Sequence, residues 1–328
     1  MTHTRSSSII SRRLALGLLL LAAPFAATAQ PSRVARIGYL SSLSPPADAS
    51  RREAFRDGLR ALGYVEEQNA MIEARYADGR FERLPELAAD LVRLNVDVIV
   101  AAPTSAIKAA RQATRTIPIV MGFSGDPIGE GLVAGLARPG GNITGLSATV
   151  AEMAGKRVEF LKAVAPEISR VAFLANTAIV KQAVSGTEAA GRTLGVHVQT
   201  VLVRKPSELG DVLSAPKKMQ VGGLIVDLTL QERWPQILEA ALKHRLPTVS
   251  GPRDFVEMGG LMSYGPHYAD LFRRAATYVD KILKGARPAD LPVEQATRFE
   301  FFINRRTARA IGVAIPPSLL LQADQVID

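Results

Sequence analysis

Residues 95–113, NVDVIVAAPTSAIKAARQA, decide the fold of this chain. The run Asp97–Ala101 is apolar after its first residue and rich in β-branched side chains, which predicts a strand buried on both faces of a sheet. A short polar loop follows at 103–105, and the segment Ser105–Ala113 has the pattern of a helix. Strand, short loop and helix in this order form the repeating unit of a parallel α/β sheet.

The same unit recurs on both sides of this stretch. In the first half of the chain, strands are expected at Arg36–Leu40, Met71–Tyr76 and Pro118–Met121, and helices at Arg51–Leu62, Glu82–Leu94 and Ile128–Ala137. After Pro139-Gly140-Gly141 the alternation of predicted strands and helices begins again. Strands are expected there at Asn142–Ala148, Arg170–Ala175, His197–Val203, Gly223–Asp227, Pro247–Val249, Gly260–Tyr264 and Phe299–Ile303. Helices are expected at Ala151–Val164, Val180–Leu194, Ser207–Leu213, Trp234–Lys243, Ala269–Lys284 and Arg305–Ile311.

The pattern therefore predicts two tandem α/β domains, each a doubly wound parallel sheet. In such sheets, ligands bind outside the carboxyl ends of the strands. A crevice between two domains of this kind is the natural place for a ligand.

The first thirty residues have the pattern of a signal peptide. Its parts are a basic start, an apolar run and a small-x-small cleavage site, found here as Arg5, Arg12 and Arg13, as residues 14–23, and as Ala27-Thr28-Ala29. The run is shorter than the roughly 20 residues that span a bilayer, and Pro24 interrupts it, which disfavours a membrane anchor. We expect cleavage after residue 29 and export to the periplasm. Ser11-Arg12-Arg13 leaves the general and the twin-arginine routes both open.

Composition excludes several classes of protein. The chain has no cysteine, which excludes disulfides and a lipid-modified N-terminal cysteine. The formal net charge is +9, and removal of the three arginines of the signal leaves +6. A nucleic-acid partner is disfavoured, because the basic pairs are scattered and have no aromatic residues between them. Attraction to an anionic ligand or partner stays open.

Signals for catalysis are weak. The chain has no Gly-x-Ser-x-Gly elbow, no phosphate-binding Walker sequence and no dinucleotide fingerprint in its first β/α unit. Its four histidines, His3, His197, His244 and His267, show no metal-ligand spacing. We therefore expect neither an enzyme nor a metal or cofactor.

Small polar residues follow the strands of both domains. They are Ser41-Ser42, Thr104-Ser105, Ser124-Gly125-Asp126, Asn176-Thr177, Asp227 and Ser250-Gly251. Hydroxyl groups beside the free N–H groups of a helix start suit a carboxylate, and an aspartate suits a ligand ammonium or hydroxyl. The alternative is that these residues only cap helices. For a single loop we favour the cap, and for the convergent set we favour a ligand site.

Tyr264-Gly265-Pro266-His267-Tyr268 is a second candidate feature. Two tyrosines beside a chain crossing could line a pocket and stack on a ligand. A structural aromatic at a hinge is an equal alternative.

A series of ordered motifs resembles one known family. The motifs are Asp126-Pro127, Gly131-Leu132-Val133, the run 138–145, the run 259–265, the run 282–293, Asn304, Ala308, Ile311-Gly312, Ile315-Pro316-Pro317-Ser318 and the run 323–327. Together they resemble the ABC-transporter substrate-binding proteins of the tryptophan/tyrosine type, over nearly the whole chain after the signal.

The resemblance implies a type I periplasmic binding fold, with two Rossmann-like lobes joined by a three-segment hinge. It implies a first lobe at 34–147 and 265–292 and a second at 148–264 and 293–328. It also implies capture of a small polar ligand between the lobes, an amino acid or a related carboxylate, and delivery to an ABC permease by a monomer without a cofactor. The candidate ligand-binding residues are Ser41, Ser42, Thr104, Ser105, Phe123, Asp126, Asn176, Asp227 and Tyr264.

Within the resemblance, three roles follow for an amino-acid ligand. Thr104 and Ser105 at their helix start would bind the carboxylate, Asp227 would bind the ammonium, and Tyr264 or Phe123 would contact the side chain.

Three other classes of function stay open from the sequence. The first is a sensory subunit that presents its ligand to a membrane receptor. The second is an exported enzyme, which the missing catalytic motifs disfavour. The third is the effector domain of a repressor, which the signal peptide and the missing DNA-binding module disfavour.

Overall fold

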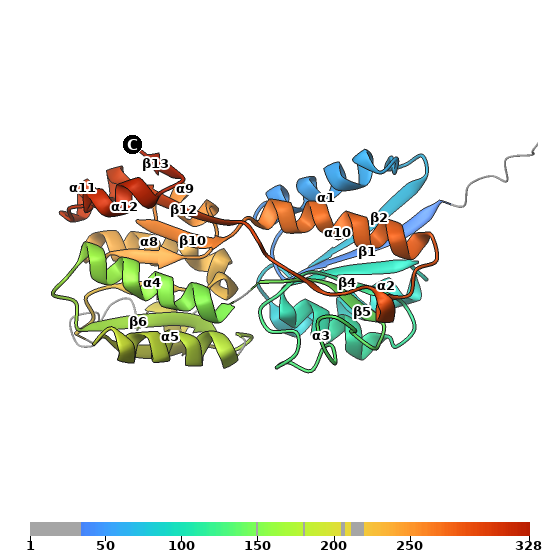
Figure 1. Cartoon of the computed structure of the whole chain (residues 1–328), viewed down its shortest axis with the longest axis horizontal. Helices are drawn as coiled ribbons and strands as arrows, with labels where there is room; N and C mark the ends of the chain where they lie inside the picture. Colours follow the sequence, from blue (N-terminus) through green and yellow to red (C-terminus); the bar gives the residue numbers. More distant parts are fainter. Residues whose placement is uncertain (1–33, 149, 180, 205–206, 211–219) are drawn as a thin grey trace, which may run out of the picture. The chain divides into compact units, whose positions relative to one another are not determined.

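The computed structural model describes residues 34–148, 150–179, 181–204, 207–210 and 220–328, which form two α/β lobes (Figure 1). Each lobe has its own sheet, and the first sheet has the strand order β11-β5-β4-β3-β1-β2 with every pair parallel. This arrangement confirms the expected fold class.

The first lobe is built from the first half of the chain and a later return. Its strands are β1 (Ala35–Ser41), β2 (Ala70–Tyr76), β3 (Val98–Ala102), β4 (Ile119–Ser124), β5 (Ile143–Ser147) and β11 (Glu294–Gln295). Its helices are α1 (Ala49–Ala61), α2 (Leu84–Arg93), α3 (Thr104–Ala113) and α10 (Tyr268–Leu283), with short 3₁₀ turns at Phe81–Arg83 and Pro288–Asp290.

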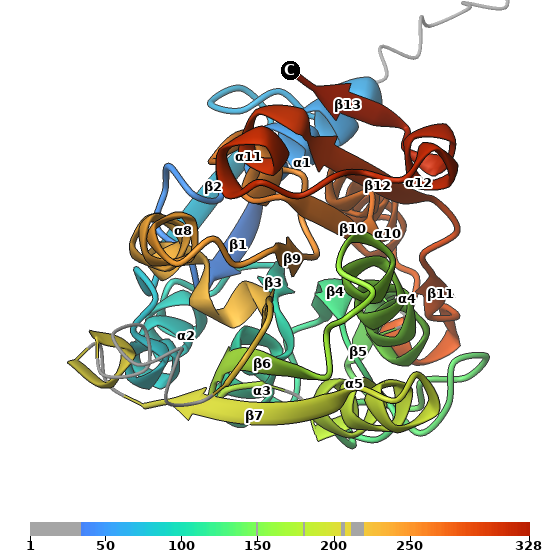
Figure 2. The same ribbon diagram turned by 90° about the vertical axis from the view of Figure 1, so that its left-hand side faces the viewer.

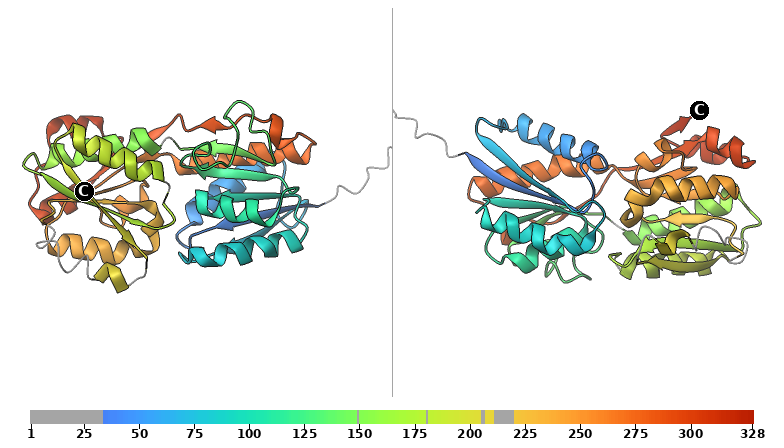
Figure 3. Two further views of the ribbon diagram at one scale, coloured as in Figure 1. Left: turned by 90° about the horizontal axis from the view of Figure 1, so that it is seen from below. Right: turned by 180° about the vertical axis from the view of Figure 1, so that it is seen from behind.

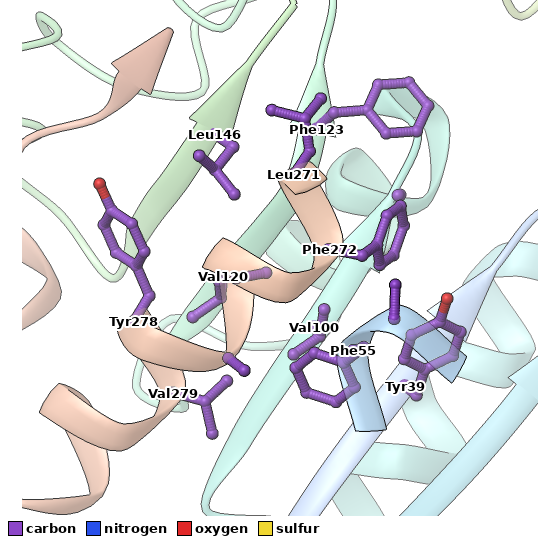
Figure 4. Close-up of a cluster of buried hydrophobic side chains, with 14 of the residues drawn as sticks. Tyr39, Phe55, Val100, Val120, Phe123, Leu146, Leu271, Phe272, Tyr278 and Val279 are labelled. Atoms are coloured by element: carbon purple, nitrogen blue, oxygen red, sulfur yellow. The ribbon is translucent and has the colours of Figure 1, made fainter. Parts of the chain in front are cut away.

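Helices cover both faces of the first sheet (Figure 3). On one face, α1 and α10 pack over the strands, and Figure 4 shows Phe55 of α1 and Phe272 of α10 beside Val100 in the same cluster. On the other face, α2 and α3 cover alternate residues of the same strands, such as Ile99. Burial on both faces explains why β3 reads as a continuous apolar run.

The second lobe has the strand order β13-β12-β10-β9-β8-β6-β7, which is parallel except for the antiparallel pair β10 and β12. Its strands are β6 (Arg170–Asn176), β7 (His197–Val203), β8 (Leu224–Val226), β9 (Thr248–Ser250), β10 (Met262–Pro266), β12 (Phe299–Asn304) and β13 (Gln325–Ile327). Its helices are α4 (Val150–Val164), α5 (Lys181–Thr193), α8 (Trp234–Lys243), α9 (Asp254–Glu257), α11 (Arg305–Ile311) and α12 (Pro317–Gln322), with a 3₁₀ segment, η2, at Leu228–Arg233.

The second sheet also alternates its side chains between two cores. Along β6, Val171 and Phe173 face the core that contains α4, and Ala172 and Leu174 face the core that contains α8. Figure 2 shows α4 and α8 on opposite sides of this sheet. The period of two along the strand therefore places α4 and α8 on different faces.

One predicted helix is wrong. Ile128–Ala137 forms a series of turns, in which the N–H of Leu132 and that of Val133 both donate to the carbonyl of Pro127. Gly131 has a φ of 64°, which a right-handed helix does not contain. The apolar spacing that suggested a helix arises because Leu132 and Val133 are buried against α2 and α3.

The other differences are small. The predicted helix Ser207–Leu213 lies partly outside the described residues, which here include only its helical part 207–210. The sequence did not indicate α9, α12, β11 or β13, because each is six residues long or shorter.

The chain passes between the two sheets three times: after β5, between β10 and α10, and after β11. β11 pairs with β5 of the first sheet, and β12 then pairs with β10 of the second. The exact lobe limits at 147, 264 and 292 stay a prediction. The three passages leave the carboxyl ends of β3, β4 and β8 beside the same cavity.

Candidate functional site

A cavity lies between the two lobes, and the atom-free space in and in front of it, solvent included, is about 530 Å³. Its lining from the first lobe follows the strand ends, and consists of Pro103, Thr104, Ser105, Phe123, Gly125, Ala148 and Tyr268. Its lining from the second lobe consists of Met153, Arg157, Ala178, Ile179, Ala183, Asp227, Leu228 and Thr229.

The first lobe gives the cavity an uncharged wall. Phe123 is buried, with its ring 4.9 Å from that of Tyr268 in an edge-to-face arrangement. Ser105 is the second residue of α3, and its buried hydroxyl has no hydrogen-bond partner. Since no side chain caps α3, the start of this helix is free to meet a ligand. Thr104 differs, because its Oγ1 lies 3.1 Å from the Oγ of Ser124 and accepts the N–H of Gly125.

The second lobe gives the cavity its charged wall. Asp227 follows β8 and is only 8% exposed, and one carboxylate oxygen accepts the N–H of Thr229 at 2.9 Å. Burial raises the pKa of Asp227, although hydrogen bonds from Thr229 and the charge of Arg157 act in the opposite direction. A carboxylate held in this way gains from a cationic ligand group beside it.

Arg157 of α4 is the other charged residue of this wall. It is only 7% exposed, and its Nε donates to the carbonyl oxygen of Tyr264 at 2.9 Å. Burial lowers the pKa of the guanidinium, opposed by nearby Tyr268, Asp227 and Tyr264. The sequence reasoning missed Arg157. The available signal was a basic residue on the apolar stripe of the predicted helix Ala151–Val164, four residues after Met153.

The structure brings four of the nine predicted site residues to this cavity: Thr104, Ser105, Phe123 and Asp227. The other five lie elsewhere, and two of them act as local caps. The carboxylate of Asp126 accepts the N–H of Gly129, and the side-chain oxygen of Asn176 accepts the N–H of Ala178. Asn176 also lines a second hollow, together with Asp78 and Arg233.

The remaining three serve the packing of their own lobes. Ser41 is buried and accepts the N–H of Leu43, and the buried Ser42 accepts the N–H of Gly79 at its carbonyl. Tyr264 packs its ring against Phe160 and two further phenylalanines of the second lobe. Of the two tyrosines in the 264–268 motif, only Tyr268 lines the cavity.

A second set of contacts joins the lobes outside the cavity, and we call it the interlobe bridge. It consists of Ser44, Asp48 and Arg51 from the first lobe and Gln231 and Glu232 from the second. The N–H and the hydroxyl of Ser44 donate to the two carboxylate oxygens of Glu232, at 2.7 and 3.1 Å. Arg51 donates to the side-chain oxygen of Gln231 at 3.0 Å and lies 3.7 Å from Asp48. The carboxylate of Glu232 and the guanidinium of Arg51 therefore both have partners within the bridge.

Two other kinds of site are absent from the part of the chain that the structure describes. No group of three or more His, Asp or Glu side chains there could hold a metal ion. None of its helices combines the length and the apolar character needed to cross a membrane.

The chain is similar in sequence to proteins that bind solutes. A family model described as ABC transporter substrate binding protein matches residues 36–327. A tyrosine-binding protein of Clostridioides difficile (strain R20291) is 26% identical over 280 residues, which make up 84% of this chain and 81% of that protein.

Two solved structures are similar over most of the chain. An ABC domain in complex with L-Trp from Streptococcus pneumonia is 29% identical, covers 89% of this chain and 99% of its own, and has a TM-score of 0.81. The ligand-free, open structure of a substrate-binding protein with adhesive properties from Clostridium difficile is 26% identical. It covers 87% of this chain and 97% of its own, and has a TM-score of 0.63. The two-lobed fold is that of type I periplasmic binding proteins.

Proposed function

Because the chain belongs to the family of ABC transporter substrate-binding proteins, we propose that it is the solute-binding component of an ABC importer and that its ligand is an amino acid with an aromatic side chain. In this proposal, residues 1–29 direct export and are removed, and the protein acts in the periplasm as a monomer. It carries the ligand to a membrane permease without chemical change.

The observation that carries the proposal is the composition of the cavity. An amino acid has an ammonium, a carboxylate and a side chain, and the cavity offers Asp227, Arg157 with the free start of α3, and the apolar surfaces of Phe123 and Tyr268. Charged groups in a buried site bind opposite charges more strongly than they do in water. The tyrosine-binding relative and the structure with L-Trp support an aromatic side chain.

The interlobe bridge supports a mechanism by closure. A ligand that contacts both lobes favours the arrangement in which they meet, and the bridge adds polar contacts to that arrangement. The greater similarity of this structure to the L-Trp complex than to the ligand-free, open structure agrees with a closed arrangement. Release to the permease then requires the bridge to open.

A thermal-shift screen tests this function. The protein is unfolded and refolded to remove any ligand that co-purified, then heated with amino acids, aromatic acids, amines, nucleosides and sugars. A ligand at about 100 times its dissociation constant stabilises the folded state by about 2.7 kcal/mol. We expect the largest shift from L-tryptophan or L-tyrosine. A shift only with sugars or nucleosides would disprove the proposed ligand class and leave the fold assignment intact.

A further inference from the structure

Arg157 carries a positive charge that is buried at the wall of the cavity. Among the described residues, no carboxylate oxygen lies within 4.0 Å of its guanidinium, and its hydrogen-bond partners are the carbonyl of Tyr264 and, at 4.0 Å, the sulfur of Met153. An arginine does not lose its proton in a protein. A buried charge without a partner is unfavourable by several kcal/mol.

Arg51 provides an internal comparison. It is also almost fully buried, but it has Asp48 at 3.7 Å and the side-chain oxygen of Gln231 at 3.0 Å. The same chain therefore pairs one buried arginine with an anion and places the other at the wall of the cavity. This contrast points to the cavity as the place where an anion would bind Arg157.

The surroundings of Arg157 hold its side chain in position. Its Nε is fixed by Tyr264, so the two terminal nitrogens keep donors for another group. Gly251 lies beside Nη2, and a Cβ at that position would come within 2.8 Å of this atom. Nη1 and the N–H of Nη2 that does not point to the sulfur of Met153 remain as donors, and such a planar guanidinium matches a carboxylate in the paired geometry that arginine favours.

Asp227 does not fill this role. It lines the same cavity and lies outside ion-pair distance of Arg157, with one oxygen accepting the N–H of Thr229. Within the described part of the chain, these two groups of the second-lobe wall have no ion-pair contact, although the charge of each acts on the pKa of the other. A zwitterion supplies both partners at once.

We infer that Arg157 binds the carboxylate of the ligand by paired hydrogen bonds, so that the site takes zwitterionic amino acids and discriminates against amines that lack the carboxylate. The inference rests on the proposed function and changes the expected roles, because it assigns the main carboxylate contact to the second lobe. Ser105 and the start of α3 are then secondary contacts.

Isothermal titration calorimetry with three matched compounds tests this assignment: L-tryptophan, tryptamine, which lacks the carboxylate, and indole-3-propionate, which lacks the ammonium. The variants are Arg157→Met, Arg157→Lys and Ser105→Ala. Loss of one partner of a buried charge pair weakens binding by about 30-fold or more. We expect such a loss for L-tryptophan and indole-3-propionate with Arg157→Met, and a change below threefold for tryptamine.

Two variants separate the assigned role from its alternatives. Arg157→Lys retains the charge without the paired geometry, so we expect an intermediate loss for the two carboxylates. Ser105→Ala removes one neutral hydrogen bond, so we expect a loss of about tenfold at most. A larger loss with Ser105→Ala than with Arg157→Met, or an equal loss for tryptamine and L-tryptophan, would overturn the inference.

The failure of the inference can be distinguished from that of the proposed function. If the unaltered protein binds none of the amino acids, the proposed ligand is wrong, and the ligand-free melting temperature then tests only whether the protein itself compensates the charge of Arg157. A higher value in Arg157→Met supports an uncompensated charge, because the variant removes the cost of a buried ion that has no partner. An equal or lower value would show no such cost and would overturn the inference.

Discussion

The interlobe bridge and the cavity both lie where the two lobes meet, yet their buried polar groups differ in whether they have hydrogen-bond or ion-pair partners. In the bridge, the carboxylate of Glu232 accepts two hydrogen bonds from Ser44, and Arg51 has both Gln231 and Asp48. In the cavity, the hydroxyl of Ser105 has no partner, and Arg157 has no carboxylate in contact among the described residues.

This contrast separates polar groups that are paired within the protein from polar groups that a ligand could pair. A buried polar group without a partner is unfavourable, so proteins retain few of them. A cluster of such groups in one cavity marks a binding site better than any single residue type. The polar groups of the interlobe bridge, in contrast, have their hydrogen-bond partners within the protein.

The variant Asp227→Asn tests the role of the cavity, and we expect it to have the largest effect on ligand affinity. The amide keeps the acceptor for the N–H of Thr229 but cannot neutralise a ligand ammonium. We expect binding of L-tryptophan to weaken by about 2–5 kcal/mol, as measured by calorimetry. Asp126→Asn is the matched control, because the carboxylate of Asp126 caps Gly129 outside the cavity. Equal losses in both variants would show that the cavity is not the site.

The variant Glu232→Gln tests the role of the interlobe bridge, and we expect it to have a smaller effect on ligand affinity. The amide keeps the shape but loses the charge that strengthens the two hydrogen bonds from Ser44. We expect ligand affinity to fall by about 0.5–1.5 kcal/mol, because a smaller closed fraction reduces the apparent affinity. The control is Glu239→Gln, an exposed position on α8. If both variants bind like the unaltered protein, the bridge does not contribute to closure.

The smallest effect concerns the ligand-free protein and its pH dependence. Burial raises the pKa of Asp227 above that of the unfolded chain. The folded state is therefore penalised increasingly as pH rises through the folded pKa, and the penalty vanishes below the unfolded value. We expect Asp227→Asn to raise the ligand-free melting temperature by a few degrees at neutral pH and by nothing near pH 4 or below.

Melting curves between about pH 4 and pH 8 measure this difference, with Asp126→Asn again as the control. A constant difference at every pH would mean that the carboxylate of Asp227 is already compensated without a ligand. In that case the contrast between bridge and cavity would rest on Arg157 and Ser105 alone.

Part of the candidate site could be predicted from the sequence. Thr104, Ser105 and Asp227 were found because polar residues directly after buried strands lie at the carboxyl edge of a parallel sheet. The same rule gave Asp126 and Asn176, whose side chains instead cap their own loops. A loop sequence does not distinguish these cases, because the capping partner and the ligand compete for the same oxygen.

The amino-acid pattern was enough to predict the alternation of strands and helices, the division into two sheets and the loops at which strands end. These features depend on periods of 2 and 3.6 residues and on local signals at helix ends. Only the tertiary structure decided which polar groups have partners. Ser44 and Glu232 are 188 residues apart in the chain, and Arg157 meets the carbonyl of Tyr264 across 107 residues. Whether a buried charge is neutralised depends on such distant contacts, and no local pattern records them.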